Sequence, residues 1–274
     1  MPSHDPSSPA ATDPEELLRI AVEAAAAASA YLVESLHRDD LVHESKTSAT
    51  DMVTDVDRTS ERLIVGHILA ARPGDGILGE EGGTHEGSTG VRWIIDPLDG
   101  TTNFLYGHGG FGVSVAAEID GTVVAAAVHD PLGHDEFAAV LGGGATRNGT
   151  PISVNDPVDT AVALVATGFA YQAERRALQA GVLTTLLPAV RDIRRMGAAA
   201  VDLCSVACGR VDAFYERGLG AWDFAAGALI ASEAGALVGD LSGGPPSGEF
   251  VLAAGPALFG PLAAILRDAG AATA

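Results

Sequence analysis

The segment 93–104, WIIDPLDGTTNF, places two carboxylates, Asp96 and Asp99, directly ahead of a glycine and two threonines. Acids beside a helix start suit a cation held together with a phosphate, because carboxylates bind the cation and free N–H groups bind the anion. For a bare D-P-x-D-G string, a turn with a capped helix is the simpler interpretation. The full twelve-residue string favours a site.

The elements around these two acids follow from their neighbours. The apolar residues 93–95 predict the end of a buried strand, and Pro97 predicts that the strand stops there. Asp96 is then expected at the strand exit and Asp99 in an exposed turn. Gly100-Thr101-Thr102 predicts a helix start whose hydroxyls cap the helix.

Three further acids lie at strand exits or helix starts, where the sites of α/β proteins gather. Glu80 ends the short apolar run 77–78, Asp223 opens a helix, and Asp57 lies one turn into another. Each acid also has a simpler interpretation. Glu80 is a solvated loop tip, Asp223 an ordinary N-cap, and Asp57 an acid favoured by the helix macrodipole in the first turn. Oxygen donors without paired His or Cys select Mg²⁺ before Zn²⁺, with Mn²⁺ as a substitute.

The string D-P-L-D-G-T-T-N-F resembles the first signature of the inositol monophosphatase family of Mg²⁺-dependent phosphatases. Residues 222–228, WDFAAGA, resemble the second signature, and residues 51–57 and 80–81 also match. The likeness runs from about residue 14 to the C-terminus. It implies an α+β or α/β fold, a layered α-β-α-β-α sandwich of the sugar-phosphatase type. It also implies a homodimer and inhibition by lithium.

The resemblance also implies roles for individual residues. One Mg²⁺ is held by Glu80, Asp96 and the Leu98 carbonyl, a second by Asp96, Asp99 and Asp223, and a third through waters on Glu80. The pair Asp57 and Thr101 helps to activate the attacking water, Gly100 and Thr101 offer N–H groups to the phosphate, and Lys46 lies on a mobile loop.

Substrate contacts are implied at Gly197, Ala198, Ala199 and Glu216, the places where family members touch inositol hydroxyls. Relatives carry Ser or Thr where this chain has Ala198, so a side-chain contact is lost there. Glu216 has a solvated strand-end acid as its alternative. Arg194 and Arg195 face phosphate, a dimer partner or only water, and water is the leading interpretation.

The rest of the sequence divides into a tail and two subdomains. Residues 1–13 are expected to be a disordered tail. Residues 14–155 form an α+β subdomain with an antiparallel sheet and most metal ligands, and 156–274 form an α/β subdomain that completes the site. Within the first subdomain we expect a helix from Pro14 to about Leu36, a loop over 43–50, and a helix from Thr54 or Asp55. The apolar face of this last helix is Leu63, Ile64 and Ile68.

The totals exclude several classes of protein. The 274 residues carry 16 basic and 36 acidic side chains, a net charge of −20, which repels nucleic acid and anionic membranes. A phosphate substrate is admitted only where bound cations invert that field. Cys204 and Cys208 are expected to be core residues without a disulfide. No signal peptide or membrane span is evident, so the cytoplasm is expected.

The predicted reaction is hydrolysis of a phosphate monoester by direct, metal-activated attack of water. A small phosphorylated polyol, inositol 1-phosphate, is the first substrate. Histidinol phosphate, fructose 1,6-bisphosphate and 3′-phosphoadenosine 5′-phosphate are alternatives on the same site. A regulatory, protein-binding member with little activity is the alternative of a different class.

Overall fold

The computed structural model describes residues 12–36, 43–45 and 52–274. Two helices cover one side of the molecule. The first, α1 (Pro14–Ser35), is capped by Asp13, whose carboxylate accepts a hydrogen bond from the Glu15 N–H. The second, α2 (Asp55–Ala71), is capped by Thr54. On α2, Ile64 and Ile68 are buried as expected, whereas Leu63 is 41% exposed, so its placement on the apolar face was wrong.

A two-stranded ribbon and a seven-stranded sheet make up most of the N-terminal half. The ribbon pairs β1 (His43–Ser45) with β2 (Met52–Thr54), so the loop expected over 43–50 begins as a strand, while 46–51 lie outside the described residues. The sheet runs in the order β3-β4-β5-β6-β7-β8-β9 and is antiparallel apart from the β3–β4 pair. Its strands are β3 (Gly76–Gly79), β4 (Val91–Asp99), β5 (Gly112–Ile119), β6 (Thr122–Asp130), β7 (Asp135–Val140), β8 (Gly144–Arg147) and β9 (Thr150–Pro151).

The second half builds a five-stranded sheet in the order β11-β10-β12-β14-β13. Strands β11, β10 and β12 are parallel, and β14 and β13 pair antiparallel to their neighbours. The strands are β10 (Leu164–Thr167), β11 (Asp192–Arg194), β12 (Ala213–Glu216), β13 (Leu237–Gly239) and β14 (Val251–Ala254); the helices are α4 (Ala173–Leu186), α5 (Ala199–Ala207), α6 (Ala221–Glu233) and α7 (Pro256–Asp268).

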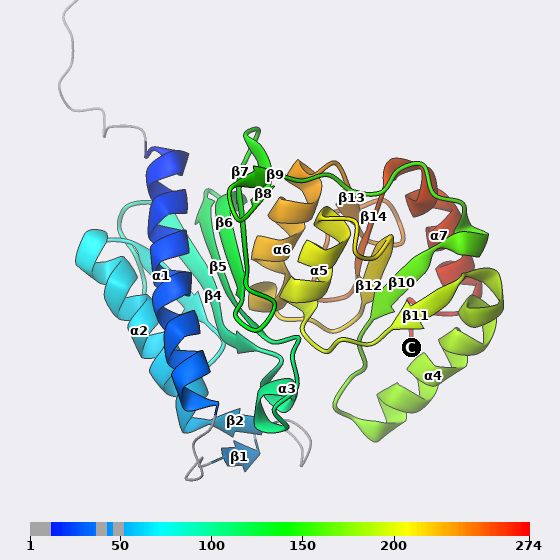
Figure 1. Ribbon diagram of the computed structural model, residues 1–274, viewed down its shortest axis with the longest axis horizontal. Coiled ribbons are helices and arrows are strands. Elements are labelled where there is room, and N and C mark those ends of the chain that lie inside the picture. Colours follow the sequence, from blue (N-terminus) through cyan, green and yellow to red (C-terminus); the bar gives the residue numbers. More distant parts are fainter. Residues whose placement is uncertain (1–11, 37–42, 46–51) are drawn as a thin grey trace, which may run out of the picture.

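The helices and sheets stack as five layers, and the predicted α-β-α-β-α sandwich is confirmed. Figure 1 shows α1 and α2 on the outer face of the seven-stranded sheet, α5 and α6 between the sheets, and α4 and α7 beyond the second sheet. The middle layer is rich in alanine, and a Cβ on Gly227 of α6 would lie only 2.7 Å from the Leu203 Cβ on α5. Small residues thus let two helices fill the space between the sheets. The division near residue 155 stays a prediction.

The end of β4 differs from the expectation. The strand continues through Pro97 to Asp99, with a shift in its register against β5 between Asp96 and Asp99. Asp99 is therefore buried rather than in an exposed turn. The irregular pairing lets the strand carry both acids to the same end of the sheet. The short helix α3 (Thr101–Leu105) follows at once.

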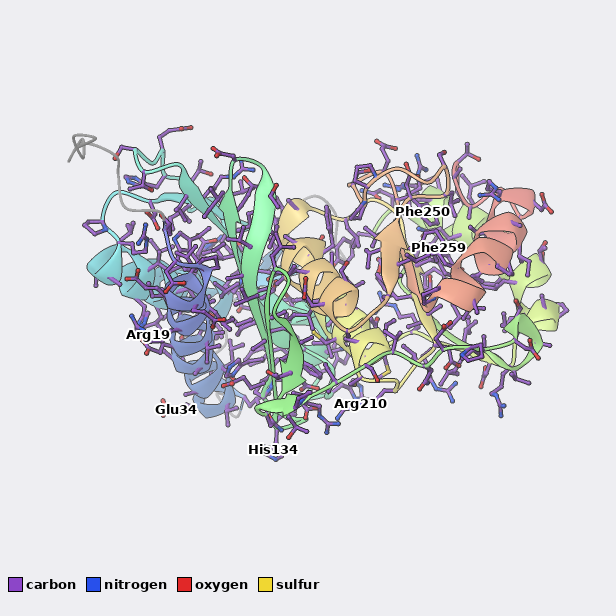
Figure 2. All side chains as sticks on the ribbon, turned by 90° about the horizontal axis from the view of Figure 1, so that it is seen from above. Arg19, Glu34, His134, Arg210, Phe250 and Phe259 are labelled. Carbon is purple, nitrogen blue, oxygen red and sulfur yellow. The ribbon has the colours of Figure 1, made fainter. Side chains whose placement is uncertain are left out.

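An ion pair links the middle layer to the first sheet. Arg210, just after α5, forms this ion pair: its Nη2 lies 2.6 Å from Asp135 Oδ2 on β7. Figure 2 shows Arg210 at the same edge of the molecule as His134. On the far side, Phe259 of α7 packs against the hydrophobic cluster that contains Phe250 (Figure 2). Cys204 is buried, Cys208 is half-buried, and neither forms a disulfide. Among the described residues, no helix is long and apolar enough to cross a membrane.

Candidate active site

A cavity of about 380 Å³ opens where the ends of β4, β12, α5 and α6 meet. Its walls include three of the predicted acids, Glu80, Asp99 and Asp223. The predicted substrate contacts Gly100, Gly197, Ala199 and Glu216 line the same cavity. Residues more than 140 positions apart in the sequence are thus brought to one opening.

The acids repel one another strongly. Asp96 and Asp99 are 1% and 8% exposed. Burial raises the pKa of Asp96 well above its usual range, and the charges of Glu80, Asp99 and Asp223 raise it further. Burial also raises the pKa of Asp99, with the Asp223 charge as the next cause. All four carboxylates therefore lie within electrostatic reach of one another.

Three of these carboxylates each accept a hydrogen bond from a backbone N–H group, which fixes the position of one carboxylate oxygen. The Leu98 N–H donates to Asp96 Oδ1 at 3.0 Å, and the Gly220 N–H donates to Asp223 Oδ2 at 2.6 Å. The Ala200 N–H donates to Asp99 Oδ2 at 2.7 Å. This last bond places Asp99 at the start of α5, which has no side-chain cap of its own in the described chain. Asp99 thus supplies the acceptor that the helix start needs.

The donor set fits a hard divalent cation. It consists of carboxylate oxygens, which Mg²⁺ prefers, and a cation would relieve the repulsion that, together with the larger effect of burial, raises the pKa values of Asp96 and Asp99. Among the described residues, no three His, Cys, Asp or Glu side chains are arranged closely enough in this structure to hold a metal ion.

Asp57 and Thr101, predicted as a pair from the resemblance, are joined by a hydrogen bond. The Thr101 hydroxyl donates to Asp57 Oδ1 at 2.9 Å, while Asp57 Oδ2 accepts from the Thr54 N–H at 2.9 Å and from the Thr54 hydroxyl. Asp57 is fully buried, and this burial raises its pKa although the hydrogen bonds oppose the rise. The expectation that the Thr101 hydroxyl caps α3 was wrong, because it is directed to Asp57 instead, and in the described chain no side chain caps this helix.

Gly100 brings the acid segment against the predicted substrate segment. Its φ of 90° lies in the left-handed region, and a Cβ there would be 3.2 Å from both the Ala198 Cβ and the Gly197 carbonyl oxygen. Asn103 fastens the same contact, since its Nδ2 donates to the Met196 carbonyl at 2.7 Å. Any side chain at position 100 would push these two segments apart.

Glu216 lies at the end of β12 with its carboxylate packed over Gly168. Burial is the largest cause that raises its pKa to about 8; the Asp223 charge raises it further and the Arg195 charge opposes the rise. Lys46 lies outside the described residues. Leu98 is buried, and its carbonyl oxygen lies 3.2 Å from the Thr101 hydroxyl oxygen, as a second, longer acceptor for the proton that Thr101 donates to Asp57.

Glu216→Gln is expected to stabilise the metal-free protein in a pH-dependent way. Because the folded pKa lies above the unfolded value of 4.5, charging Glu216 disfavours the folded state as pH rises from 4.5 to about 8. The gain in the free energy of unfolding should be absent at pH 4 and reach on the order of 2 kcal/mol by pH 8.5. This value is smaller than the pKa shift alone would give, because solvent screens the charge of this half-buried side chain. Melting temperatures in EDTA across that range test this. A gain that is equal at pH 4 and pH 8.5 contradicts it.

Two buried acids near the site were missed from the sequence. Asp202, on α5, is 1% exposed, and burial raises its pKa well above the usual range, with the Glu216 charge as the next cause. Glu61, on α2, is 7% exposed and accepts from the N–H groups of Glu81 and Gly83, both at 2.9 Å. The available signal was an acid on an otherwise buried helix face: Glu61 is three residues before Ile64, and Asp202 is the one charge in its apolar run.

Glu61→Gln is expected to weaken Mg²⁺ binding about tenfold, as is usual when the support of a metal site is altered. Glu61 clamps the loop that carries Glu80, and a glutamine turns an N–H₂ group toward one of the two N–H donors. Calorimetric titration with Mg²⁺ measures the change. Glu34→Gln, on the exposed face of α1, is the matched control. If Glu61→Gln lowers the melting temperature but binds Mg²⁺ as the wild type does, the clamp has only a structural role.

Comparisons with known proteins place the chain. Residues 13–271 match the profile described as the inositol monophosphatase family. The inositol-1-monophosphatase of Mycobacterium leprae is 43% identical, with 93% of this chain and 94% of that protein covered. Nus factor SuhB of Pseudomonas aeruginosa is 42% identical, with 84% and 87% covered. The crystal structure of the extragenic suppressor protein suhB from Bartonella henselae superposes with a TM-score of 0.88 at 35% identity, covering 92% and 98%.

The layered fold, the acid-lined cavity and these relatives together define a phosphatase, a phosphoric monoester hydrolase. More particularly, the chain belongs to the inositol monophosphatase family.

Proposed function

We propose that this phosphatase hydrolyses phosphate monoesters of small polyols, with inositol 1-phosphate as the first substrate, and that it depends on Mg²⁺. The single observation that carries the proposal is a set of four mutually repelling carboxylates. Glu80, Asp99 and Asp223 line one cavity, and the fourth, Asp96, is buried within electrostatic reach of them. Such a set would repel a phosphate dianion unless cations were bound. The name of the Mycobacterium leprae relative supports the choice of substrate.

Two to three Mg²⁺ ions, or Mn²⁺ in their place, would be held by the carboxylates of Glu80, Asp96, Asp99 and Asp223 and by the Leu98 carbonyl. When bound, the ions supply positive charge that stabilises the phosphoryl oxygens and acidifies the attacking water.

The protein's own groups orient the reactants. Thr101 already donates its proton to Asp57, so its oxygen is left to accept a hydrogen bond from the attacking water. Burial raises the pKa of Asp57, which makes it a better proton acceptor toward the Thr101 hydroxyl. Gly100 and Thr101 N–H groups bind the phosphate, and Gly197, Ala198, Ala199 and Glu216 contact the hydroxyls of the polyol. A homodimer, a cytoplasmic location and lithium sensitivity belong to the same proposal.

Steady-state kinetics across four substrates, with Mg²⁺ and with EDTA, test this proposal. We expect activity on inositol 1-phosphate that EDTA abolishes. Histidinol phosphate, fructose 1,6-bisphosphate and 3′-phosphoadenosine 5′-phosphate are the competing substrates. A kcat/KM for inositol 1-phosphate far below that for one of them would replace the first choice.

A regulatory, protein-binding role is the second candidate. It is favoured by the relatives named Nus factor SuhB. A group of four acids, three of them lining one cavity, serves no evident purpose in a protein that only binds a partner. Equal, negligible phosphate release with Mg²⁺ and with EDTA would favour this second role.

A further inference from the structure

One buried acid lies behind the end of the cavity at which the polyol is proposed to bind. Asp202, on α5, is 1% exposed and does not itself line the cavity, whereas Gly197, Ala199 and Glu216 do. Its Oδ1 atom is buried and has no hydrogen-bond partner among the residues that the structure describes. A buried acceptor without a partner costs free energy, and such local costs to stability are typical of functional sites.

Three groups of the cavity wall act on Asp202. Burial and the Glu216 charge raise the pKa of Asp202, whereas the Arg195 charge and a hydrogen bond from the Gly197 N–H oppose the rise. Arg195, Gly197 and Glu216 all line the cavity. Asp202 therefore acts on three parts of the cavity wall from inside the protein.

The backbone around Gly197 is packed closely on both sides. Gly197 has a φ of 99°, in the left-handed region, and a Cβ there would collide with Arg195 Nη1. On one side, a Cβ on Gly100 would be only 3.2 Å from the Gly197 carbonyl oxygen. On the other side, the Asp202 N–H donates to the Ala198 carbonyl oxygen at 2.9 Å, which brings the Asp202 side chain within reach of the Gly197 N–H. The segment thus lies between Gly100 and the first turn of α5.

A simpler role for Asp202 would be to cap α5 or to interact with its macrodipole from the first turn. The structure gives the capping role to Asp99, whose Oδ2 accepts from the Ala200 N–H at 2.7 Å. An exposed acid would serve the macrodipole without the cost of burial, as Glu174 does in the first turn of α4. Neither role accounts for a buried carboxylate directed at the Gly197 N–H.

We propose that Asp202 is a positioning residue for polyol recognition, which holds the Gly197 N–H from behind and so fixes the backbone of residues 197–199. The proposal rests on the proposed function, because these residues are the ones proposed to contact the polyol hydroxyls. The phosphate is proposed to bind elsewhere, at the N–H groups of Gly100 and Thr101. Loss of the acceptor at Asp202 should therefore weaken the binding of the polyol and leave the binding of phosphate unchanged.

Kinetics with inositol 1-phosphate as substrate and inorganic phosphate as inhibitor test the proposal, at saturating Mg²⁺. Asp202→Ala removes the acceptor and is expected to raise the KM for inositol 1-phosphate about tenfold, the effect of one lost hydrogen bond. The kcat and the inhibition constant of phosphate should stay within about twofold of the wild-type values, because the lost interaction concerns only the binding of the polyol. Asp202→Asn keeps an acceptor oxygen for the Gly197 N–H and should show a KM within about twofold of the wild type.

Asp130→Ala is the matched control, because Asp130 is 7% exposed, does not line the cavity and accepts from the Gly133 N–H at 2.8 Å. It should lower the melting temperature and leave the KM and the inhibition constant unchanged. If melting shows that Asp202→Ala is unfolded, Asp202→Leu, which keeps the branched shape but cannot accept a hydrogen bond, decides by the same two constants.

A wild-type KM in Asp202→Ala would overturn the proposal. So would an inhibition constant that rises in parallel with the KM, or an Asp202→Asn variant as impaired as Asp202→Ala, because both indicate a merely structural role. If the wild type hydrolyses inositol 1-phosphate with Mg²⁺ and one of these results is found, only this inference fails. If the wild type does not hydrolyse the ester, the proposed function fails, and this inference fails with it.

Discussion

Asp99→Asn is expected to lower kcat by about a thousandfold or more while raising the stability of the metal-free protein. The lost carboxylate is a proposed ligand of the cation, and a factor of a thousand corresponds to about 4 kcal/mol of transition-state stabilisation. The asparagine oxygen can still accept from the Ala200 N–H, so the start of α5 stays in place. Phosphate release with Mg²⁺ and melting in EDTA measure the two effects.

The raised pKa of Asp99 determines that Asp99→Asn stabilises the metal-free protein. Burial and the Asp223 charge raise that pKa in the folded protein, so ionised Asp99 disfavours the folded state once pH exceeds its unfolded value of 3.8. The neutral amide removes this cost at about pH 7.5 and should remove nothing below pH 3.8. Asp120→Asn is the matched control, because Asp120 is exposed in a hairpin turn at a φ of 49° that asparagine tolerates. Wild-type turnover in the Asp99 variant would refute the ligand assignment.

Asp75→Ala is expected to destabilise the protein by about 3 kcal/mol or more, the usual cost of removing one partner from a buried charged network. Asp75 is fully buried and accepts three hydrogen bonds. The donors are Arg72 Nε at 2.6 Å, Thr89 Oγ1 at 2.6 Å and Trp93 Nε1 at 2.9 Å. The network joins the end of α2 to β4, the strand that carries Asp96 and Asp99. A fall of about 6 to 12 °C in the melting temperature is therefore expected.

Asp159→Ala serves as the control for Asp75→Ala, because Asp159 is exposed and its side chain makes no cap for the short helix that follows it in the described chain. It should change the melting temperature by about 1 °C at most, as surface substitutions usually do. Equal melting temperatures for wild type and Asp75→Ala would show that the network contributes nothing to stability.

The order of elements followed from local patterns in the sequence. The helix capped by Thr54 and the helix opened by Pro14 each carry their signal within a few residues, and both are confirmed. The end of β4 was misjudged because Pro97 is tolerated at an irregularity in strand pairing, which depends on β5. Leu63 was misjudged because helical periodicity alone does not fix the width of the buried face.

The sequence predicts those residues of the site that belong to short motifs. The acids 96, 99 and 223 and the pair Asp57 with Thr101 followed from strings that resemble a known family, and the structure brings them to one place. Glu61 was missed because the N–H groups that it accepts from lie 20 and 22 residues away along the chain. Asp202 was missed because the Glu216 charge that acts on it lies 14 residues away. Likewise, the role of Asp99 at the start of α5 bridges 101 residues and leaves no local signal.

The central claim is that acids dispersed through the chain converge to hold divalent cations. Anomalous diffraction from crystals grown with Mn²⁺ tests it most directly. We predict two or three anomalous peaks within bonding distance of carboxylate oxygens of Glu80, Asp96, Asp99 and Asp223. Crystals that contain Mn²⁺ at saturating concentration and show no peak among these four side chains would contradict the account.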